Sequence, residues 1–333
     1  MKKLRSLILP IVLLFIAVIT IPTVIVSLSN DKKVEVTNED SQNELASVFD
    51  EGAAITVFRS ATNTTESIPL EQYVIGVVAS EMPADFELEA LKAQALSART
   101  YIVKAKLHAD PDAENHITDT VLHQVYKSND ELRAIWGQNY EKNMNKIKTA
   151  VKETAGQILT YDDEPITASY FSTSNGRTEN SEDYWSGALP YLKSVDSSWD
   201  IDTPKYITEI EMPVSEVEEK LGVKLPDQKE IGKVLERTAG NRIAKIEVNG
   251  KTFTGKEVRE KLELRSSDFE WTRNGNQVMI QTKGFGHGVG MSQYGANGMA
   301  QEGHDYKEIL AHYYQGTTIA EASTFLATMT AKK

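Results

Sequence analysis

The 333-residue sequence contains no cysteine, which excludes disulfide bonds and thiolate chemistry. Its six histidines form no H-E-x-x-H pattern, and without cysteine nothing points to zinc, so we expect no metal and no cofactor. No serine stands in a G-x-S-x-G elbow, which argues against a serine hydrolase. Basic residues are also scarce, 36 against 48 acidic ones, and this balance argues against nucleic-acid binding.

Acidic residues are absent from the N-terminus, where the first one is Asp31. Residues 7–28 form an uncharged, mostly apolar run that would be roughly 33 Å long as a helix, enough to cross a bilayer. A cleaved signal peptide has a shorter apolar part, so we expect an uncleaved transmembrane anchor, although small residues at 27–29 leave cleavage open. The basic cluster within residues 1–6 predicts a cytoplasmic N-terminus and an exported body, which places the protein in the cell membrane.

After the anchor, residues 29–50 are polar and are expected to be a linker. Residues 51–325 are expected to form one extracytoplasmic domain, opened by a strand at 53–60. Strands and helices alternate irregularly, which favours an α+β fold of mixed, mainly antiparallel sheets with packed helices. A smaller α+β subdomain is expected within it at residues 207–264.

Local patterns predict the elements around this subdomain. Residues 214–225 and 229–240 have the apolar spacing of helices. Asn249–Gly250 and Asn274–Gly275 each favour the tight turn of a β-hairpin. Thr254–Glu257 fits a capping box, in which a threonine and a glutamate satisfy the first N–H groups of a short helix.

One glutamate closes an apolar helix. Apolar residues recur at helical spacing from Leu70 onward, and at 100° per residue Glu81 falls roughly 20° from Leu70, in the middle of the apolar stripe. Pro83 predicts the end of this helix, and Asp85 is placed to cap the next one. A desolvated carboxyl has a raised pKa and can donate a proton near neutral pH. The alternative is a structural glutamate that bonds nearby backbone N–H groups or Arg99.

Two later segments place polar groups beside aromatic rings or glycines. Residues 168–185 lead from apolar and aromatic residues into a Ser/Thr/Asn/Gly cluster and then Tyr184–Trp185, which suits a carbohydrate but also fits a strand followed by a polar turn. In residues 282–300, alternate glycines flank His287, so the backbone can approach a ligand closely. The glycine spacing does not fit a G-x-G-x-x-G phosphate loop. A tight bend around a buried histidine is the alternative.

Three stretches together resemble the stage II sporulation protein D family of Bacillus-like endospore formers. They are "ASEMPADFELEALKAQALSARTY", "YFSTSNGRTE" and "GFGHGVGMSQYGANGMA", the last followed by "YKEILAHYYQGTTI". The order, the chain length and the N-terminal anchor agree, so the resemblance covers nearly the whole chain. It implies a lytic transglycosylase that cuts peptide-free (denuded) peptidoglycan strands between N-acetylmuramic acid and N-acetylglucosamine during engulfment of the forespore.

The resemblance also implies partners and site residues. The partners are an amidase, stage II sporulation protein P, which first strips stem peptides, and a membrane protein, stage II sporulation protein M, both at the engulfing mother-cell membrane. Glu81 matches the family's catalytic acid. The residues that match its substrate-binding motifs are Gln94, Arg99, Tyr170, Ser172, Ser174, Asn175, Gly176, His287, Ser292 and Gln293. Some relatives hold zinc through cysteines and a histidine, and this chain lacks those cysteines.

The implied reaction suits a single carboxyl group. Ordinary glycoside hydrolysis uses two carboxyl groups, whereas in a lytic transglycosylase the 6-hydroxyl of N-acetylmuramic acid attacks its own C1 and closes a 1,6-anhydro ring. Glu81 would protonate the glycosidic oxygen and then accept the hydroxyl proton, with Glu87 and Glu89 as solvated bystanders. A second hypothesis is a non-catalytic, glycan-binding enhancer of a cell-wall amidase, which would have no need of Glu81.

Overall fold

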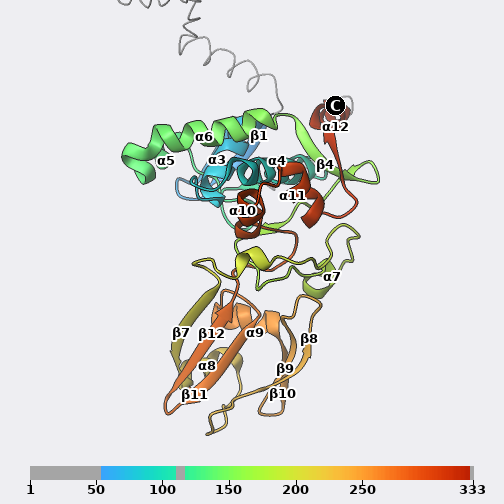
Figure 1. Ribbon diagram of the computed structural model, residues 1–333. Helices are drawn as coiled ribbons and strands as arrows, with labels where there is room; N and C mark the ends of the chain where they lie inside the picture. The colour runs from blue at the N-terminus through green and yellow to red at the C-terminus, as the bar shows by residue number, and fades with distance from the viewer. Residues whose placement is uncertain (1–53, 110–116, 331–333) are drawn as a thin grey trace, which may run out of the picture. The chain divides into compact units, whose positions relative to one another are not determined.

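Two hydrophobic cores organise the residues that the structure describes, 54–109 and 117–330, with side chains described to residue 327 (Figure 1). In this computed structural model, helices and sheets are mixed, which confirms the α+β class. None of the helices in the described ranges is long and apolar enough to span a membrane. The predicted cytoplasmic tail, anchor and linker lie outside the described residues.

The first core is built around α4 (Leu88–Leu107), which is buried along most of its length. Alanines recur on this helix, and their small side chains allow neighbouring elements to pack closely on several sides. The helices packed against it are α3 (Leu70–Glu81), α6 (Tyr140–Glu153), α10 (Gln293–Gln301), α11 (Tyr306–Tyr313) and α12 (Ala322–Thr330).

Short strands and helices complete the first core. One sheet has the order β2 (Thr64–Pro69), β1 (Ala54–Arg59), β3 (Ile117–Thr118), and another has the order β14 (Thr318–Glu321), β4 (Gln157–Tyr161), β5 (Glu164–Pro165). A two-stranded pair joins β6 (Tyr170–Phe171) to β13 (Met291–Ser292). The short helical segments are α5 (Asn129–Trp136), η1 (Gly137–Asn139), α7 (Ser181–Tyr184) and η2 (Ser198–Asp200). Among the described strands, only the β1–β3 and β6–β13 pairs are parallel, so the expected antiparallel majority is confirmed.

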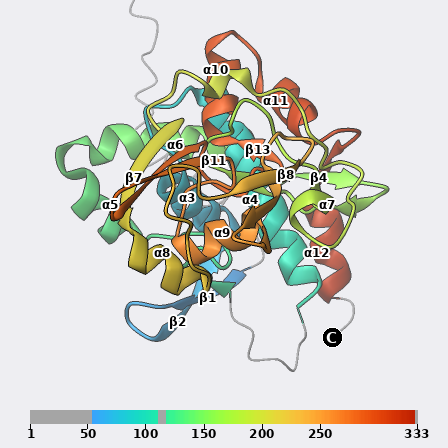
Figure 2. The same ribbon diagram turned by 90° about the horizontal axis from the view of Figure 1, so that it is seen from below.

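The second core lies between two three-stranded antiparallel sheets. Their orders are β11 (Phe269–Asn274), β12 (Gln277–Lys283), β7 (Ile207–Pro213) and β10 (Lys251–Thr254), β9 (Ile243–Val248), β8 (Lys233–Arg237). Helices α8 (Val214–Leu221) and α9 (Gly255–Leu262) lie side by side against them (Figure 2). Both predicted hairpins and the Thr254–Glu257 capping box are confirmed.

Two local predictions are wrong. Residues 229–240 do not form a helix, because Lys233–Arg237 pairs with β9 as an edge strand. Asp85 does not cap α4, whose N-cap residue is Glu87. The amide of Glu87 instead donates to the side-chain Oδ1 of Asn297 on α10, at 2.7 Å. In both places a tertiary partner, the following strand β9 in one case and the distant helix α10 in the other, overrides the local preference.

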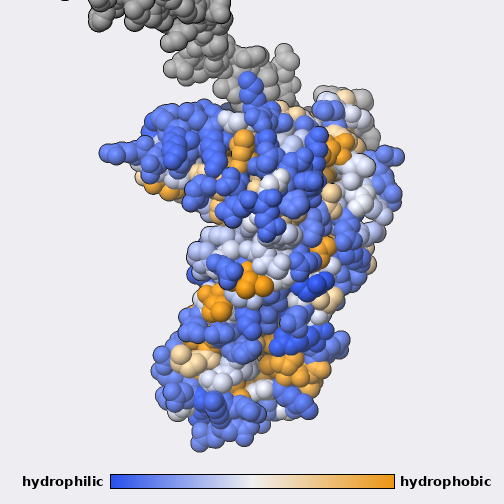
Figure 3. All heavy atoms as spheres, viewed as in Figure 1, coloured by the Kyte–Doolittle hydropathy of each residue, from blue (hydrophilic) through white to orange (hydrophobic). Residues whose placement is uncertain are grey.

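The outer surface is mainly hydrophilic on the face drawn in Figure 3, where hydrophobic residues form only small patches. Most large apolar side chains belong to the two cores. The largest exposed apolar side chains include Val121 and Leu122, which are 87% and 79% exposed. They stand in the segment that leads to the Glu81 site.

Candidate active site

Glu81 is the last residue of α3 and lies at the edge of the first core. The residues from Tyr73 to Ala79 are all buried, so protein surrounds this helix on every face and not along one stripe. Met82 is extended before Pro83 (φ −116°, ψ 142°), as a following proline favours. The helix therefore ends where the sequence predicts, and Glu81 stays partly exposed.

Two hydrogen bonds hold the Glu81 carboxyl group. The backbone N–H of Val125 donates to Oε1 over 2.9 Å, and the hydroxyl of Tyr170 donates to the same carboxyl. Burial disfavours the ionised form and raises the pKa of Glu81, while the two hydrogen bonds act in the opposite direction. Because burial is the largest effect, Glu81 keeps its proton to a higher pH than a solvated glutamate, which suits a general acid.

A buried glutamine fixes the direction of the Tyr170 hydroxyl. The Nε2 atom of Gln124 donates to the Tyr170 oxygen at 3.1 Å, and its Oε1 accepts from the hydroxyl of Tyr73 at 3.2 Å. With its oxygen accepting from Gln124, the Tyr170 hydroxyl is left to donate toward Glu81. Burial and the charge of Glu81 both raise the pKa of Tyr170, so it remains a donor. Gln124 could not be recognised from the sequence, because it stands in a segment without helical or strand periodicity.

The serine-rich and glycine-rich segments meet at this site. Strand β6, which contains Tyr170, pairs with β13, and Thr173 exchanges two backbone hydrogen bonds with Phe285, at 3.0 and 2.7 Å. Gly290 has φ +81°, and a Cβ there would lie 2.0 Å from the carbonyl oxygen of Ser169. Positive φ and this close approach both require glycine, which is why two chain segments far apart in sequence can pack so tightly.

His287 lies in this glycine-rich segment with its ring among three aromatic rings. The ring centroids of Phe171, Tyr184 and Trp185 are 5.5 to 5.7 Å from that of His287. The amide of Val289 donates to Nδ1 at 3.0 Å, so the ring proton belongs on Nε2.

Burial lowers the pKa of His287 to about 3, and the charges of Arg259 and Arg242 add to this effect. The ring is therefore neutral at physiological pH. It cannot serve as a general acid there, and its Nε2 atom already lies 3.4 Å from the hydroxyl of Ser169, so the partly exposed ring is what can contact a ligand. The aromatic character expected for this region is thus supplied jointly by His287, Tyr184 and Trp185.

Ser174 and Ser292, both predicted to bind substrate, are fully buried beside Asp200. The hydroxyl of Ser292 donates to Oδ1 of Asp200 at 2.8 Å, and that of Ser197 donates to Oδ2 at 2.8 Å. Ser174 also bonds Asp200, and Ser292 is the N-cap of α10. Burial raises the pKa of Asp200 to about 6. Ser174 and Ser292 therefore hold the loop together from within and present no surface to a ligand.

Arg99 is also fully buried and forms a two-pronged ion pair with Glu71. Its Nε and NH2 atoms donate to the two carboxylate oxygens at 2.7 and 2.6 Å. Its remaining N–H groups bond the carbonyl oxygens of Gln157 and Val151. Arg99 does not touch Glu81, and the structure gives it a role in the core.

Gln94 and Gln293 pack against each other between α4 and α10. The Nε2 atom of Gln293 donates to Oε1 of Gln94 at 3.4 Å, and both side chains are buried. The Nε2 atom of Gln94 has no hydrogen-bond partner among the described residues.

Of the two predicted bystanders, Glu87 is exposed, but Glu89 is partly buried and bonds Lys92, so it is not fully solvated.

The remaining predicted residues lie in the loop after β6. Ser172 is the first residue after β6 and is partly exposed. Asn175 donates to Oδ2 of Asp268 at 2.9 Å and so ties the loop to the second core. Gly176 has φ +102° and turns the chain. Around Glu81 the structure thus brings together Tyr170 and, through the β6–β13 pair, the His287 segment.

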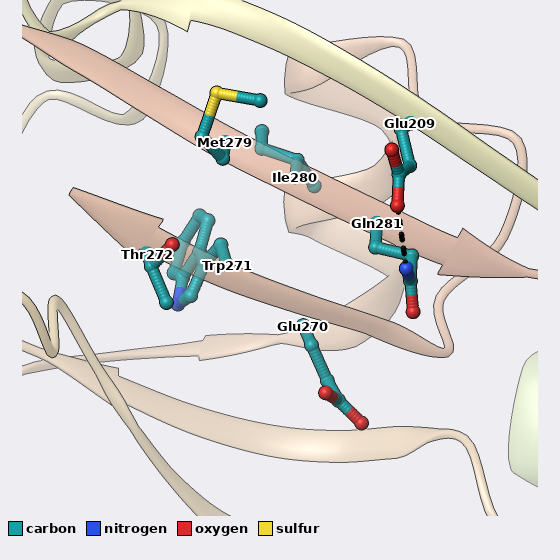
Figure 4. Close-up of a pocket in the computed structure, with 7 residues that line it drawn as sticks. All are labelled: Glu209, Glu270, Trp271, Thr272, Met279, Ile280 and Gln281. Carbon is teal, nitrogen blue, oxygen red and sulfur yellow. Dashed lines mark hydrogen bonds between the residues drawn. The ribbon is translucent and has the colours of Figure 1, made fainter. Parts of the chain in front are cut away.

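A pocket of about 250 Å³ lies elsewhere, on the outer face of the β11–β12–β7 sheet (Figure 4). Glu209 and Gln281, bonded at 2.7 Å, lie across from Trp271 and Met279 in it. No residue of the predicted site lines this pocket. In the described parts of the chain, no group of three or more histidine, aspartate or glutamate side chains is arranged to hold a metal ion.

A carboxyl of raised pKa, held by a backbone N–H and the Tyr170 hydroxyl, has the properties that a general acid needs, and it lies on an α+β fold. The chain belongs to the stage II sporulation protein D family, and it is therefore a sporulation protein. The family model described as "Stage II sporulation protein" matches residues 59–161, which include α3 with Glu81 and the whole of α4.

Relatives extend this match over most of the chain. A protein of Bacillus amyloliquefaciens named "Stage II sporulation protein D" is 48% identical over 96% of this chain and 97% of its own length. One of the same name from Bacillus subtilis (strain 168) is 53% identical over 84% of this chain and 82% of its own. A Bacillus subtilis protein named "Amidase enhancer" is 31% identical over 73% of this chain but only 40% of its own length.

Proposed function

We propose that the protein is a peptidoglycan lytic transglycosylase that cleaves peptide-free glycan strands during forespore engulfment, with Glu81 as its only acid and base. The observation that carries this proposal is the Glu81 carboxyl itself, whose pKa is raised by burial. Val125 and Tyr170 hold it in one orientation. Neither of these two partners is a carboxylate, which favours a reaction that needs only one.

In the first step Glu81 donates its proton to the glycosidic oxygen as the bond from that oxygen to C1 of N-acetylmuramic acid breaks. The positive charge that develops at C1 lies near the newly ionised carboxylate, which the Val125 N–H and the Tyr170 hydroxyl stabilise. In the second step the 6-hydroxyl of the same sugar attacks C1 and returns its proton to Glu81. The 1,6-anhydro ring forms, no water is consumed and the enzyme is regenerated.

Substrate contacts are proposed for the residues that retain exposed surface. Tyr170, Ser172, Asn175, Gly176 and His287 are all partly exposed. We assign the ring of His287, with its aromatic neighbours, to stacking against a sugar face, because neutral aromatic rings suit carbohydrate. The buried residues Gln94, Arg99, Ser174, Ser292 and Gln293 would act only by supporting the others.

The cellular setting is also a proposal, which rests on the sequence and on the family. We propose that residues 7–28 form a single anchor in the mother-cell membrane that engulfs the forespore. Residues 51–325, which include the 207–264 subdomain, would lie on the outer side of this membrane. We also propose that an amidase, stage II sporulation protein P, supplies the peptide-free strands and that stage II sporulation protein M completes the assembly. A relative named "Amidase enhancer" supports a link to amidases.

That relative also favours a second candidate function, a non-catalytic protein that binds glycan and stimulates an amidase. The two candidates differ in their need for Glu81. Digests of peptide-free strands analysed by mass spectrometry should contain 1,6-anhydromuramyl ends with the wild type and with Glu87→Gln, whose carboxyl is exposed. They should lack such ends with Glu81→Gln. If none of the three proteins produced anhydromuramyl ends and all three stimulated the amidase equally, the result would favour the non-catalytic enhancer.

A further inference from the structure

Four cations gather around the glycine-rich segment, and we call Lys205, Lys256, Arg259 and Arg265 the cationic surface. Two of them share the ring of Phe285. The Cζ atom of Arg265 lies 4.7 Å from that ring centroid, and the Nζ atom of Lys205 lies 5.7 Å from it. Both cations and the ring are at least partly exposed.

The other two cations share the ring of Tyr184. The Nζ atom of Lys256 lies 4.5 Å from its centroid, and Arg259 donates from NH1 to its hydroxyl oxygen at 3.0 Å. That ring is 5.7 Å from His287, and the charge of Arg259 helps to lower the pKa of His287. The cationic surface therefore consists of two cation–aromatic groups, one near each side of the Phe285–His287 segment.

Three of these four cations form no ion pair with a carboxylate of the described residues, although the protein is acidic. The chain has a formal net charge of −12. Yet in the described ranges no carboxylate oxygen lies within 4.0 Å of Lys205, Arg259 or Arg265, and Lys256 reaches one, on Glu260, only at 4.0 Å. Positive charges left together without counter-charges repel each other, so the arrangement favours an anion supplied by a ligand.

One cation of this surface contacts a ring that packs beside the segments flanking the Glu81 site. Lys205 also lies 5.5 Å from the ring centroid of Tyr294, and that ring meets Phe86 edge-on at 4.8 Å. Phe86 follows Glu81 by five residues. The amide of Tyr294 donates to the carbonyl of Ser172, in the loop after β6. Through Tyr294, Lys205 is therefore linked to Phe86, in the segment that follows Glu81, and to the loop after β6, the strand whose Tyr170 bonds Glu81.

We propose that the cationic surface binds the free lactyl carboxylates of N-acetylmuramic acid along the glycan strand. This inference rests on the proposed function and names the chemical group by which the protein would recognise a peptide-free strand. While a stem peptide is attached, the lactyl group is a neutral amide; removal of the peptide turns it into a carboxylate, one for each disaccharide. Aromatic rings that carry cations suit such a polymer, because the ring packs on the sugar and the cation meets the carboxylate.

Binding of the full chain to three strand preparations tests this inference. Every protein carries Glu81→Gln, which leaves the strands intact and leaves the cationic surface unchanged. The strands are peptide-free muramyl glycan, the same glycan with its lactyl carboxylates capped as methylamides, and neutral oligomers of N-acetylglucosamine. The variant is Lys205→Gln with Arg265→Gln. Its matched control is Arg133→Gln with Lys251→Gln, since these cations also lie over aromatic rings, at 4.0 and 4.8 Å, and the change in net charge is the same.

The protein with an unchanged cationic surface should bind the charged strands about tenfold more tightly than the capped strands, and added salt should remove the difference. The variant should lose this preference and keep its affinity for the capped strands, while the control keeps both. An unchanged preference in the variant would overturn the inference. So would stronger competition by a phosphate polymer such as teichoic acid than by the charged strands. Because binding is measured without cleavage, a failure of the proposed reaction would not alter these outcomes.

Discussion

The hydroxyl of Tyr170 is expected to set the pH at which Glu81 gives up its proton. It donates to the Glu81 carboxyl and is itself held by Gln124. Tyr170→Phe removes this single oxygen and retains the ring. Because a donor stabilises the ionised carboxylate, its loss should raise the pKa of Glu81 further. Activity requires the protonated acid, so the fall of kcat/KM at high pH should move to higher pH.

The size of the shift follows from the geometry. A hydrogen bond to a charged group contributes about 1.5–3 kcal/mol, which corresponds to about 1 to 2 pH units. The lower end is expected here, because Glu81 is partly exposed and water can replace part of the lost contact. The Val125 N–H still holds Oε1, so the variant should retain measurable activity.

The assay is the pH profile of kcat/KM for release of anhydromuramyl ends from peptide-free strands. Tyr314→Phe is the matched control, because this buried tyrosine donates to the carbonyl of Ser169 and not to Glu81. It should cost stability without moving the profile. A Tyr170→Phe profile that stays in place, or moves to lower pH, would show that the Tyr170 hydroxyl does not stabilise the Glu81 carboxylate.

Three further predictions concern stability. Arg99→Met should lower the free energy of unfolding, measured with denaturant, by about 3–5 kcal/mol, because it leaves the Glu71 carboxylate buried and unpaired. The double variant Arg99→Met with Glu71→Leu should recover most of that free energy, with no change in KM. Gly290→Ala should cost about 3–5 kcal/mol, because its Cβ would meet a carbonyl oxygen at 2.0 Å, whereas Gly250→Ala, with similar φ but open space, should cost about 1 kcal/mol; equal losses would contradict this account. Asp200 has a folded pKa of about 6 against 3.8 for a free carboxyl, so its contribution to stability is present below about pH 4 and is lost as pH rises through 6. Relative to Asp200→Asn, the free energy of unfolding of the wild type should therefore fall by about 2 kcal/mol between pH 4 and pH 8, and a constant difference would contradict the assignment.

Elements whose cause is local could be predicted from the sequence. Asn249–Gly250 and Asn274–Gly275 determine their hairpins through turn chemistry, and Thr254 with Glu257 determines the start of α9. Lys233–Arg237 shows the limit of this reasoning. Its apolar spacing is helical, yet all five residues are exposed on an edge strand, because pairing with β9 decides its structure.

The residues of the candidate site also differ in whether their positions have a local cause. The position of Glu81 at a helix end before a proline is local and could be predicted. Gln124 could not, because its role depends on Tyr73 and Tyr170, each more than 40 residues away in sequence. The serines of the loop after β6 have the composition of a sugar site, but only the packed structure shows Ser174 buried against Asp200. Composition identifies polar groups and cannot tell which of them turn inward.

Cleavage in water enriched in ¹⁸O distinguishes an internal transfer driven by Glu81 from hydrolysis. Peptide-free strands would be digested with the wild type, and the new ends analysed by mass spectrometry. An internal transfer should give anhydromuramyl ends that carry no ¹⁸O and that disappear with Glu81→Gln. One ¹⁸O atom incorporated for each bond cleaved by the wild type would show hydrolysis and contradict the account.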